Sequence, residues 1–206
     1  MSQMALPLAW PAPEDDRDFI VGPATADAVR HLAAWPNWPV AATLLTGPRK
    51  SGRSLLARIF AAKHDAMLID DAEQAPEETI FHAWNRAQAE HRPLLIVADA
   101  APPLWRIELP DLASRLAATP RIAIGDPDEA LAAALIEKLL GARGLAAGRE
   151  VTAYVLPRIE RSHVALHRLV DALDEVALAR RQRITVPLAR RALMSLGVID
   201  DSSNGG

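Results

Sequence analysis

The stretch VAATLLTGPRKSGRSLLARIF, residues 40–60, decides the fold. It opens with a short apolar run, residues 40–45, of the kind found in buried parallel strands. Residues 47–54, GPRKSGRS, follow at once with the length and glycine spacing of a phosphate-binding loop, G-x-x-x-x-G-K-[ST]. A pattern with one apolar helical face begins at residue 55. Strand, glycine loop and helix in this order are the context that such a loop requires.

The lysine position of this loop is occupied by Arg53. Arginine keeps the positive charge, but its guanidinium is planar and bulkier than an ammonium group, so the exchange is not neutral. Such a loop binds phosphate through successive backbone N–H groups and a helix N-terminus, and Gly47 and Gly52 permit its tight path. Ser54 is predicted to place its hydroxyl on Mg²⁺. The motif by itself also fits an unrelated strand–turn–helix.

Acidic residues end the next two expected strands. Asp70 and Asp71 follow the apolar residues 66–69, and Asp99 ends residues 93–99. After a phosphate loop, an acidic pair at this place holds magnesium and polarises a water molecule. We therefore predict Asp70 as a Mg²⁺ ligand and Asp71 as a catalytic residue. The alternative is a pair of strand-end acids that face solvent.

The order of elements predicts an α/β protein. Expected strands at 40–45, 66–71, 93–99 and 121–126 alternate with helices, the first of them at 27–35, which indicates a parallel sheet. After Asp126 the pattern is almost entirely helical, with expected helices at 151–159, where Pro157 kinks or ends the helix, at 162–180 and at 187–196. We predict an extended arm over residues 1–15, an α/β base over 16–126, a helical lid over 127–199 and a disordered tail over 200–206.

Composition excludes several classes of protein. The chain has 206 residues, half of them apolar, and a formal net charge of -3, so its bulk composition does not indicate nucleic-acid binding. It contains no cysteine, which excludes disulfides and thiolate metal sites. No apolar run approaches the roughly 18 residues of a membrane span, and the N-terminus lacks a signal-peptide pattern. We expect a cytoplasmic protein without membrane contact.

Three segments resemble one known family. They are MLIDDAEQ at residues 67–74, LLIVAD at 94–99 and LPDLASRL at 109–116. Together with the helical tail they are similar to the AAA+ module of DnaA, the bacterial replication initiator, and more closely to the shorter Hda-like proteins that regulate DnaA. The resemblance covers nearly the whole chain and implies a P-loop NTPase with a parallel-sheet base and a C-terminal all-helical lid. It also implies bound ADP or ATP with Mg²⁺ and inefficient ATP turnover, and it makes Arg53 a family trait.

The sequence departs from this family at two places. The family usually has a further strand and helix between the phosphate-loop helix and the acidic strand, whereas here the chain passes almost directly from His64 to residues 66–69. Either the sheet has one edge strand fewer than usual, or residues 66–69 replace the lost strand and the acidic match is accidental. In the lid, Val164 stands where the family has an arginine that contacts phosphate, with Arg161 and Arg168 nearby.

The resemblance also assigns residues to binding sites. Residues 111–116 resemble the segment that carries an arginine finger, so Arg115 would reach across a subunit boundary to the partner's γ-phosphate. Residues 3–8, QMALPL, resemble the motif by which Hda-like proteins dock on the DNA polymerase III sliding clamp, through Gln3, Met4, Leu6, Pro7 and Leu8. The implied nucleotide contacts are Ile20, Val21, Gly47, Pro48, Ser51, Gly52, Arg53, Ser54, Leu55, Asp99, Arg161 and Arg168.

The predicted function is regulation of the initiation of chromosomal replication. The protein would hold ADP, dock on the clamp and stimulate ATP hydrolysis by DnaA, associated with the nucleoid and touching DNA at most indirectly; a homo-oligomer is compatible with this function. One alternative is a self-contained ATPase that uses Ser54, Asp70 and Asp71, although Arg53 speaks against efficient turnover. Another is a DnaA-like accessory or loader protein that binds DNA, although the acidic balance speaks against it. The sequence shows no helix-turn-helix domain of the kind that a full initiator appends.

Two further clusters have weaker support. His163 and His167 stand four residues apart on an expected helix and could bind zinc, but no third ligand stands at a familiar spacing. Residues 179–183, ARRQR, could contact DNA phosphate, although basic residues at this place more often cap a helix C-terminus.

Overall fold

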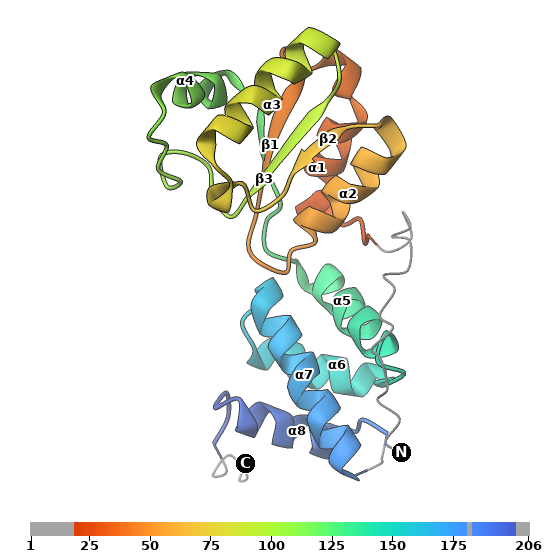
Figure 1. Cartoon of the computed structure of the whole chain (residues 1–206). Coiled ribbons are helices and arrows are strands. Elements are labelled where there is room, and N and C mark those ends of the chain that lie inside the picture. Colours follow the sequence, from red (N-terminus) through yellow and green to blue (C-terminus); the bar gives the residue numbers. More distant parts are fainter. Residues whose placement is uncertain (1–18, 181–182, 201–206) are drawn as a thin grey trace, which may run out of the picture.

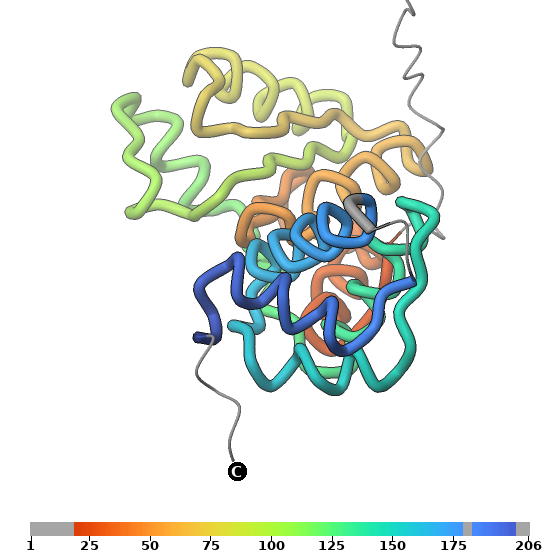
Figure 2. Tube along the Cα trace, turned by 90° about the horizontal axis from the view of Figure 1, so that it is seen from below, coloured from red at the N-terminus to blue at the C-terminus, as the bar shows by residue number. Residues whose placement is uncertain are grey.

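The computed structural model of the chain describes residues 19–180 and 183–200. The expected arm at residues 1–15 and residues 201–206 of the expected tail lie outside this range. Within it, the chain forms a parallel sheet with helices on both faces, followed by a separate group of helices (Figure 1). In Figure 2, which is turned by 90°, the helical group lies in front of the sheet part.

The sheet has four strands in the described residues, and all neighbouring strands are parallel. They are β1, Ala42–Thr46; β2, Met67–Ile69; β3, Leu94–Ala98; and β4, Arg121–Ala123. Their order is β2-β3-β1-β4. The two central strands, β1 and β3, are covered on both faces, which explains why they read as continuous apolar runs rather than as alternating patterns.

Two pairs of helices cover the sheet. Helices α1, Pro23–Ala33, and α2, Arg53–His64, pack on one face, and α3, Glu77–Glu90, and α4, Pro110–Ala118, pack on the other. Successive residues of β3 alternate between the two faces. Leu94 and Ile96 belong to the core under α3 and α4, while Leu95 and Val97 belong to the core under α1 and α2.

The edge of the sheet confirms the expectation of one strand fewer than is usual in the resembled family. Strand β2 pairs with β3 along one side, from Met67 opposite Leu94, and its other side has no partner strand in the described chain. A single left-handed residue, Asp65 with φ 50°, turns the chain from α2 into β2. The acidic residues that follow β2 lie beside the phosphate loop, because the Ser54 hydroxyl donates to Asp70 Oδ1 at 2.9 Å. The acidic pair therefore lies beside the phosphate loop, as the interpretation with one edge strand fewer expects.

The helical group has a core of its own. Its helices are α5, Glu129–Gly141; α6, Arg149–Val155; α7, His163–Arg180; and α8, Val186–Ser195. Sixteen buried residues between Ala132 and Leu193 form one apolar cluster. Asp128 caps α5 by accepting a hydrogen bond from the backbone N–H of Leu131 at 2.7 Å. As expected, Pro157 lies where α6 gives way to a single 3-10 turn, Leu156–Arg158.

Several predicted boundaries differ from the structure; for example, the strands expected at 66–71 and 121–126 are shorter, at Met67–Ile69 and Arg121–Ala123. The first helix begins at Pro23 rather than at residue 27, because proline is well suited to the first position of a helix. The first strand spans Ala42–Thr46 rather than residues 40–45. None of these shifts moves the phosphate loop.

The sheet part and the helical group meet at a few described contacts. Gly125, just after β4, is itself fixed within the sheet part, because its backbone N–H donates to the carbonyl of Ala24 on α1 at 3.3 Å. His163 Nε2 at the start of α7 lies 3.1 Å from the carbonyl oxygen of the same Gly125. These contacts hold the first turn of α7 over the end of β4, close to the phosphate loop.

Of the helices within residues 19–180 and 183–200, none combines the length and the apolar character that a membrane crossing requires.

Candidate nucleotide-binding site

The loop between β1 and α2 requires both of its glycines. A Cβ at Gly47 would lie 3.0 Å from the carbonyl oxygen of Ile124 and 3.1 Å from Ser51 Oγ. Gly52 has φ +84°, and a Cβ there would lie 3.1 Å from the ring of Phe19. Gly52 also begins α2 without a side-chain cap, so the first N–H groups of the helix are open to an anion. The loop thus has the backbone geometry of a phosphate site.

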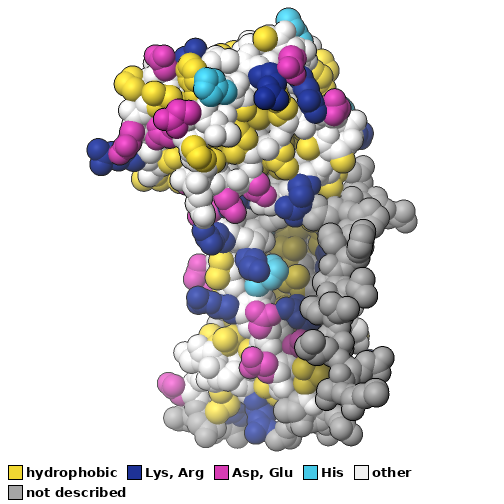
Figure 3. All heavy atoms as spheres, in the orientation of Figure 1, with side chains coloured by type: hydrophobic (Ala, Val, Ile, Leu, Met, Phe, Trp, Pro, Cys, Tyr) yellow, Lys and Arg dark blue, Asp and Glu magenta, His cyan; other side chains and the backbone are white. Residues whose placement is uncertain are grey.

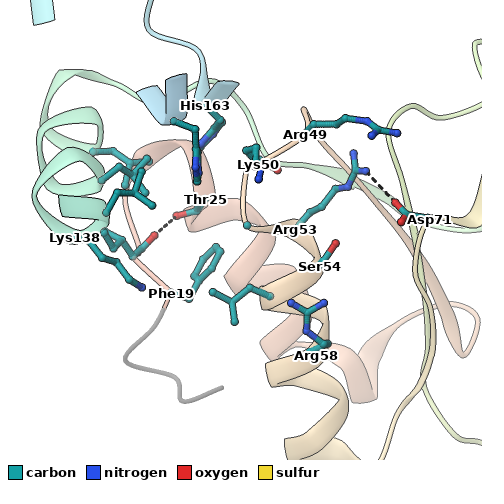
Figure 4. Close-up of a pocket in the computed structure, with 18 residues that line it drawn as sticks. Phe19, Thr25, Arg49, Lys50, Arg53, Ser54, Arg58, Asp71, Lys138 and His163 are labelled. Carbon is teal, nitrogen blue, oxygen red and sulfur yellow. Dashed lines mark hydrogen bonds and ion pairs between the residues drawn. The ribbon is translucent and has the colours of Figure 1, made fainter. Parts of the chain in front are cut away.

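A pocket of about 640 Å³ opens from this loop toward the helical group. Figure 3 shows the surface hollowed between the two parts, with hydrophobic side chains in the recess and Lys or Arg side chains around it. The loop and α2 form one wall, and α5 and α7 form the other (Figure 4). The lining residues from the sheet part are Phe19, Ile20, Thr25, Arg49, Lys50, Ser51, Gly52, Arg53, Ser54, Leu55, Arg58 and Asp71, and those from the helical group are Leu131, Leu135, Lys138, Leu139, His163 and His167.

Ser51 supplies an independent sign of a ligand in the loop. Its hydroxyl oxygen is buried and has no hydrogen-bond partner within the described residues. The residue is 5% exposed and lines the pocket. A buried hydroxyl without a partner is costly, so an unsatisfied one at a binding loop points to a group that arrives with the ligand. A phosphate oxygen in the loop would satisfy it.

Arg53 lines the pocket, but its guanidinium is taken up by contacts that brace the loop. Its side chain is buried, and its two terminal nitrogens donate to the carbonyl of Gly47 and to the carboxylate of Asp99. Asp71 Oδ1 lies 3.7 Å from the same guanidinium (Figure 4). A buried charge persists only when it is paired and hydrogen-bonded. Arg53 therefore ties the beginning of the loop to the end of β3.

The pairing also sets the charge state of Asp99. The hydrogen bond from Arg53, helped by Arg49, holds the pKa of this carboxyl below its ordinary value of 3.8, against the opposing effect of burial. Arg49 Nε donates to Asp99 Oδ2 at 3.2 Å. Asp99 therefore remains ionised between two arginines of the loop.

The acidic pair after β2 lies next to Ser54. Asp70 Oδ1 accepts hydrogen bonds from the Ser54 hydroxyl at 2.9 Å and from the backbone N–H of Asp71 at 3.1 Å. Asp70 Oδ2 lies 3.5 Å from Arg58, which stands one helical turn after Ser54 on α2. The structure thus brings together Ser54, Asp70, Asp71 and Asp99, which the sequence predicted from separate segments.

The basic residues on the pocket wall formed by α5 and α7 are not the ones that the sequence predicted. Arg161 does not line the pocket and instead lies 3.8 Å from Glu129 Oε2, and Arg168 is exposed elsewhere on α7. The basic side chains that do line it from this side are Lys138, His163 and His167. Burial lowers the pKa of His167 below its ordinary value. Nucleotide contact by Arg161 and Arg168 stays a prediction without geometric support here.

Of the other predicted nucleotide contacts, some line the pocket and some do not. Ile20 and Leu55 line the pocket, whereas Val21 is 61% exposed and faces a different, apolar groove between α1 and α2. Pro48 belongs to the loop but does not line the pocket. The zinc interpretation of His163 and His167 gains no support, because no group of three or more metal-binding side chains occurs in the described residues.

Sequence reasoning missed several lining residues. Arg58 could have been found, because it follows Ser54 by four residues and so shares its helix face. Leu131, Leu135 and Leu139 form a regular stripe that reads as ordinary core. No local signal in the sequence marks Phe19 or Lys138 as pocket residues.

Arg115 lies outside this pocket, on α4. Its Nε donates to Asn85 Oδ1 at 3.0 Å and one terminal nitrogen donates to the carbonyl of Asp111 at 3.1 Å. The guanidinium lies 4.3 Å from the ring centroid of Phe81 and 5.4 Å from that of Trp84. Its second terminal nitrogen makes no hydrogen bond within the described chain. The side chain is therefore held on the surface of α3 with one edge open.

Comparison with known proteins agrees with this geometry. A family model described as the Hda lid domain matches residues 128–193, which include α5 to most of α8. Domain III of the replication initiation protein DnaA from Thermotoga maritima has the same fold, with a TM-score of 0.72 at 15% identity over 87% of this chain and 95% of that one. Residues 128–193 thus match the lid domain of Hda, and the chain as a whole has the α/β fold of DnaA domain III.

Other relatives fit the same fold. AMPPCP-bound DnaA from Aquifex aeolicus is similar with a TM-score of 0.63 at 15% identity, over 88% of this chain and 68% of that one. The Holliday junction branch migration motor RuvB of Thermotoga maritima reaches 0.64 at 15% identity, over 92% and 75%. Among curated proteins, an uncharacterized protein of Haemophilus influenzae is 26% identical over 118 residues, or 57% of this chain. The match spans 51% of that relative, so this chain corresponds to about half of its length.

The brace between Arg53 and Asp99 predicts a pH-dependent contribution to stability. Because the pKa of Asp99 is lowered in the folded state, its contribution is present above the unfolded value and is lost as the pH falls through the folded value. Asp99→Asn should therefore lower Tm at pH 7, and the gap from the wild type should close below about pH 4. Thermal melts of both proteins at pH 7, 5 and 3 measure this. A gap of equal size at pH 3 and pH 7 would show that the ionised carboxylate is not the cause.

Proposed function

We propose that this protein is a regulator of replication initiation that holds ADP, docks on the DNA sliding clamp and stimulates ATP hydrolysis by DnaA. The observation that carries the proposal is the phosphate loop with the unsatisfied Ser51 hydroxyl, facing a lid of the Hda type. The proposal places the protein in the bacterial cytoplasm with the nucleoid. It contacts DNA at most through its partners.

The nucleotide occupies the pocket between loop and lid. Its phosphates lie on the N–H groups of residues 52–54 and on the Ser51 hydroxyl, and Lys50 adds charge at the loop. Phe19 and the leucines of α5 supply an apolar surface for the base at the other end of the pocket. The DnaA of Aquifex aeolicus, which has the same fold, is described as bound to AMPPCP.

The same geometry disfavours turnover in this protein's own site. Arg53 pairs with Asp99 and with the loop carbonyl, so its charge is not available to a γ-phosphate. Asp71, the predicted catalytic acid, lies beside this guanidinium. A positive group placed on the γ-phosphate is a large part of catalysis in phosphate-loop enzymes. The site is therefore suited to holding ADP.

ADP binding should depend on the loop backbone more than on the Arg53 side chain. Gly52→Val should abolish it, because valine is strained at φ +84° and its side chain would meet Phe19. Arg53→Ala should weaken binding but leave it detectable, since the N–H groups remain. Calorimetric titration of ADP into the two variants and the wild type checks this order. Tight binding by Gly52→Val together with none by Arg53→Ala would remove the assignment of the loop.

Arg115 acts on the partner's nucleotide. It is remote from this chain's own pocket and keeps one edge of its guanidinium open, as a side chain that serves a neighbouring subunit must. Two N–H groups on that edge can reach the γ-phosphate of ATP bound to DnaA. The same surface would allow a homo-oligomer.

Arg115→Ala should reduce the stimulated ATP hydrolysis by DnaA by a factor on the order of 10³ while leaving ADP affinity intact. The variant should also lose about 1–2 kcal/mol of stability through its lost contacts with Phe81 and Asn85. Arg86→Ala, which removes an exposed arginine of α3, is the matched control and should stimulate normally. The assay uses DNA-loaded clamp and ATP-bound DnaA. Full stimulation by Arg115→Ala beside an inactive Asp71→Asn would instead identify a self-contained ATPase.

Clamp docking rests on the sequence of residues 3–8, which lie outside the described residues. Deleting residues 1–8 should eliminate co-migration with the sliding clamp in gel filtration, because the motif supplies the glutamine and apolar side chains that the clamp would bind. The same deletion should leave Tm and ADP binding unchanged, since it removes no residue of the described cores or pocket. Undiminished clamp binding by the truncated protein would show that QMALPL is only a leader.

A further inference from the structure

Lys50 has a backbone conformation that is unfavourable for its residue type. It lies in the phosphate loop, three residues before Arg53, with φ 67°. This left-handed region suits glycine, such as Gly52 in the same loop, but crowds the Cβ of other residues. Asp65 and His91 share the conformation, but they end helices α2 and α3, where it is common. A residue held in this way inside a binding loop suggests a function for its side chain.

The charge of Lys50 is the unpaired one in the loop. Arg49 and Arg53, on either side of it in the sequence, both pair with Asp99. Lys50 makes no hydrogen bond or ion pair within the part of the chain that the structure describes, although it is exposed and lines the pocket. Since the Arg53 guanidinium is held by Asp99 and by the loop carbonyl, Lys50 is the loop cation that a phosphate can attract without breaking a contact.

His167 lies on the opposite wall of the pocket. It follows His163 by one turn of α7, and both residues line the pocket. The hydrogen bond between His163 and the Gly125 carbonyl holds this end of α7 over the end of β4, close to the phosphate loop. Burial lowers the pKa of His167, and the positive charge of Lys50 lowers it further. Lys50 and the His167 imidazole are thus close enough across the pocket for the charge of one to act on the other.

The remaining charged groups around His167 come from α5, from the segment that follows α5 and from α7 itself. Asp171 raises the pKa of His167 and Arg143 lowers it, and these two side chains pair with each other. His163 lowers the pKa as well, and Lys138 of α5 lines the same pocket. His167 is therefore mainly neutral at pH 7 in the protein alone. An anion between it and the loop would favour its protonated form.

We infer that Lys50 and His167 bind the phosphates of ADP from opposite sides, Lys50 in place of the lysine that the loop motif lacks and His167 as the contact from the lid. The inference rests on the proposed nucleotide site and adds to it the two side chains that close on the ligand and a dependence on pH. A lysine suits the loop side, because its compact charge sits on a flexible stem. Two facing groups of like charge are unfavourable alone and favourable with an anion between them.

Calorimetric titration of ADP at pH 7, in one buffer with Mg²⁺ throughout, tests the loop side. Lys50→Gln, which keeps most of the side chain and removes its charge, should weaken binding about tenfold, the value of a charge-assisted hydrogen bond. Lys50→Gly should bind as weakly without a lower Tm, because glycine adopts φ 67° without strain. Lys63→Gln is the matched control, since Lys63 lies near the end of α2 and lines a different groove, and it should bind like the wild type.

The same titration at pH 8, 7 and 6 tests the lid side. The ratio of the ADP affinity of the wild type to that of His167→Gln should rise severalfold as the pH falls, because only the wild type gains a cation there. Comparing the two proteins at each pH cancels the titration of the ADP phosphates. A constant ratio, or a Lys50→Gln variant that binds like the wild type, would overturn the inference and leave the nucleotide site standing. Absence of ADP binding by the wild type would overturn the nucleotide site as well.

Discussion

The buried guanidinium of Arg53 is the constraint on which the site depends. It joins the two ends of the loop, Gly47 and the start of α2, to the carboxylate that follows β3, which is 46 residues away in the sequence. Desolvating this charge would be costly without the carboxylate, and without Arg53 the only remaining arginine beside Asp99 in the described residues would be the exposed Arg49. The pair therefore fixes the loop relative to the sheet before any ligand is present. Gly47 and Gly52 permit the backbone conformation of the loop, and the pair of Arg53 and Asp99 stabilises it.

The brace also explains how a phosphate loop can keep its shape while losing its lysine. In this structure the side chain at the lysine position has a structural role, so on the proposed function phosphate would be bound by backbone N–H groups, Ser51 and nearby cations. Such a loop binds an anion well. It provides few interactions with the γ-phosphate that become stronger in the transition state of hydrolysis, and only such interactions accelerate the reaction. A nucleotide-holding subunit whose arginine finger serves its neighbour is the function that this division of tasks supports best.

Much of the base could be predicted from the sequence, because its central strands are buried on both faces and read as apolar runs. The loop was predictable from its glycines, and Asp70, Asp71 and Asp99 from their places after strands. The shortened sheet was one of two open alternatives. It is tolerated because the lost unit would lie beyond β2, at the edge, where its absence leaves the pairing of β1 with β3 and β4 intact.

The contacts that depend on side-chain direction could not be predicted. Nothing local to residues 47–54 says that Arg53 turns back to Gly47 and Asp99 instead of forward to a ligand. The lid wall depends on how α7 packs over the end of β4, which brings His163 rather than Arg161 to the pocket. Arg115 has a recognisable motif, but its stacking on Phe81 depends on the packing of α4 against α3.

A crystal structure of this chain with ADP tests the account most directly. The account predicts the β-phosphate on the loop N–H groups, with the Ser51 hydroxyl bonded to a phosphate oxygen and Arg53 still paired with Asp99 and the Gly47 carbonyl. A structure in which Arg53 has turned onto the phosphate and released Asp99, or in which ADP lies away from the loop, would contradict it.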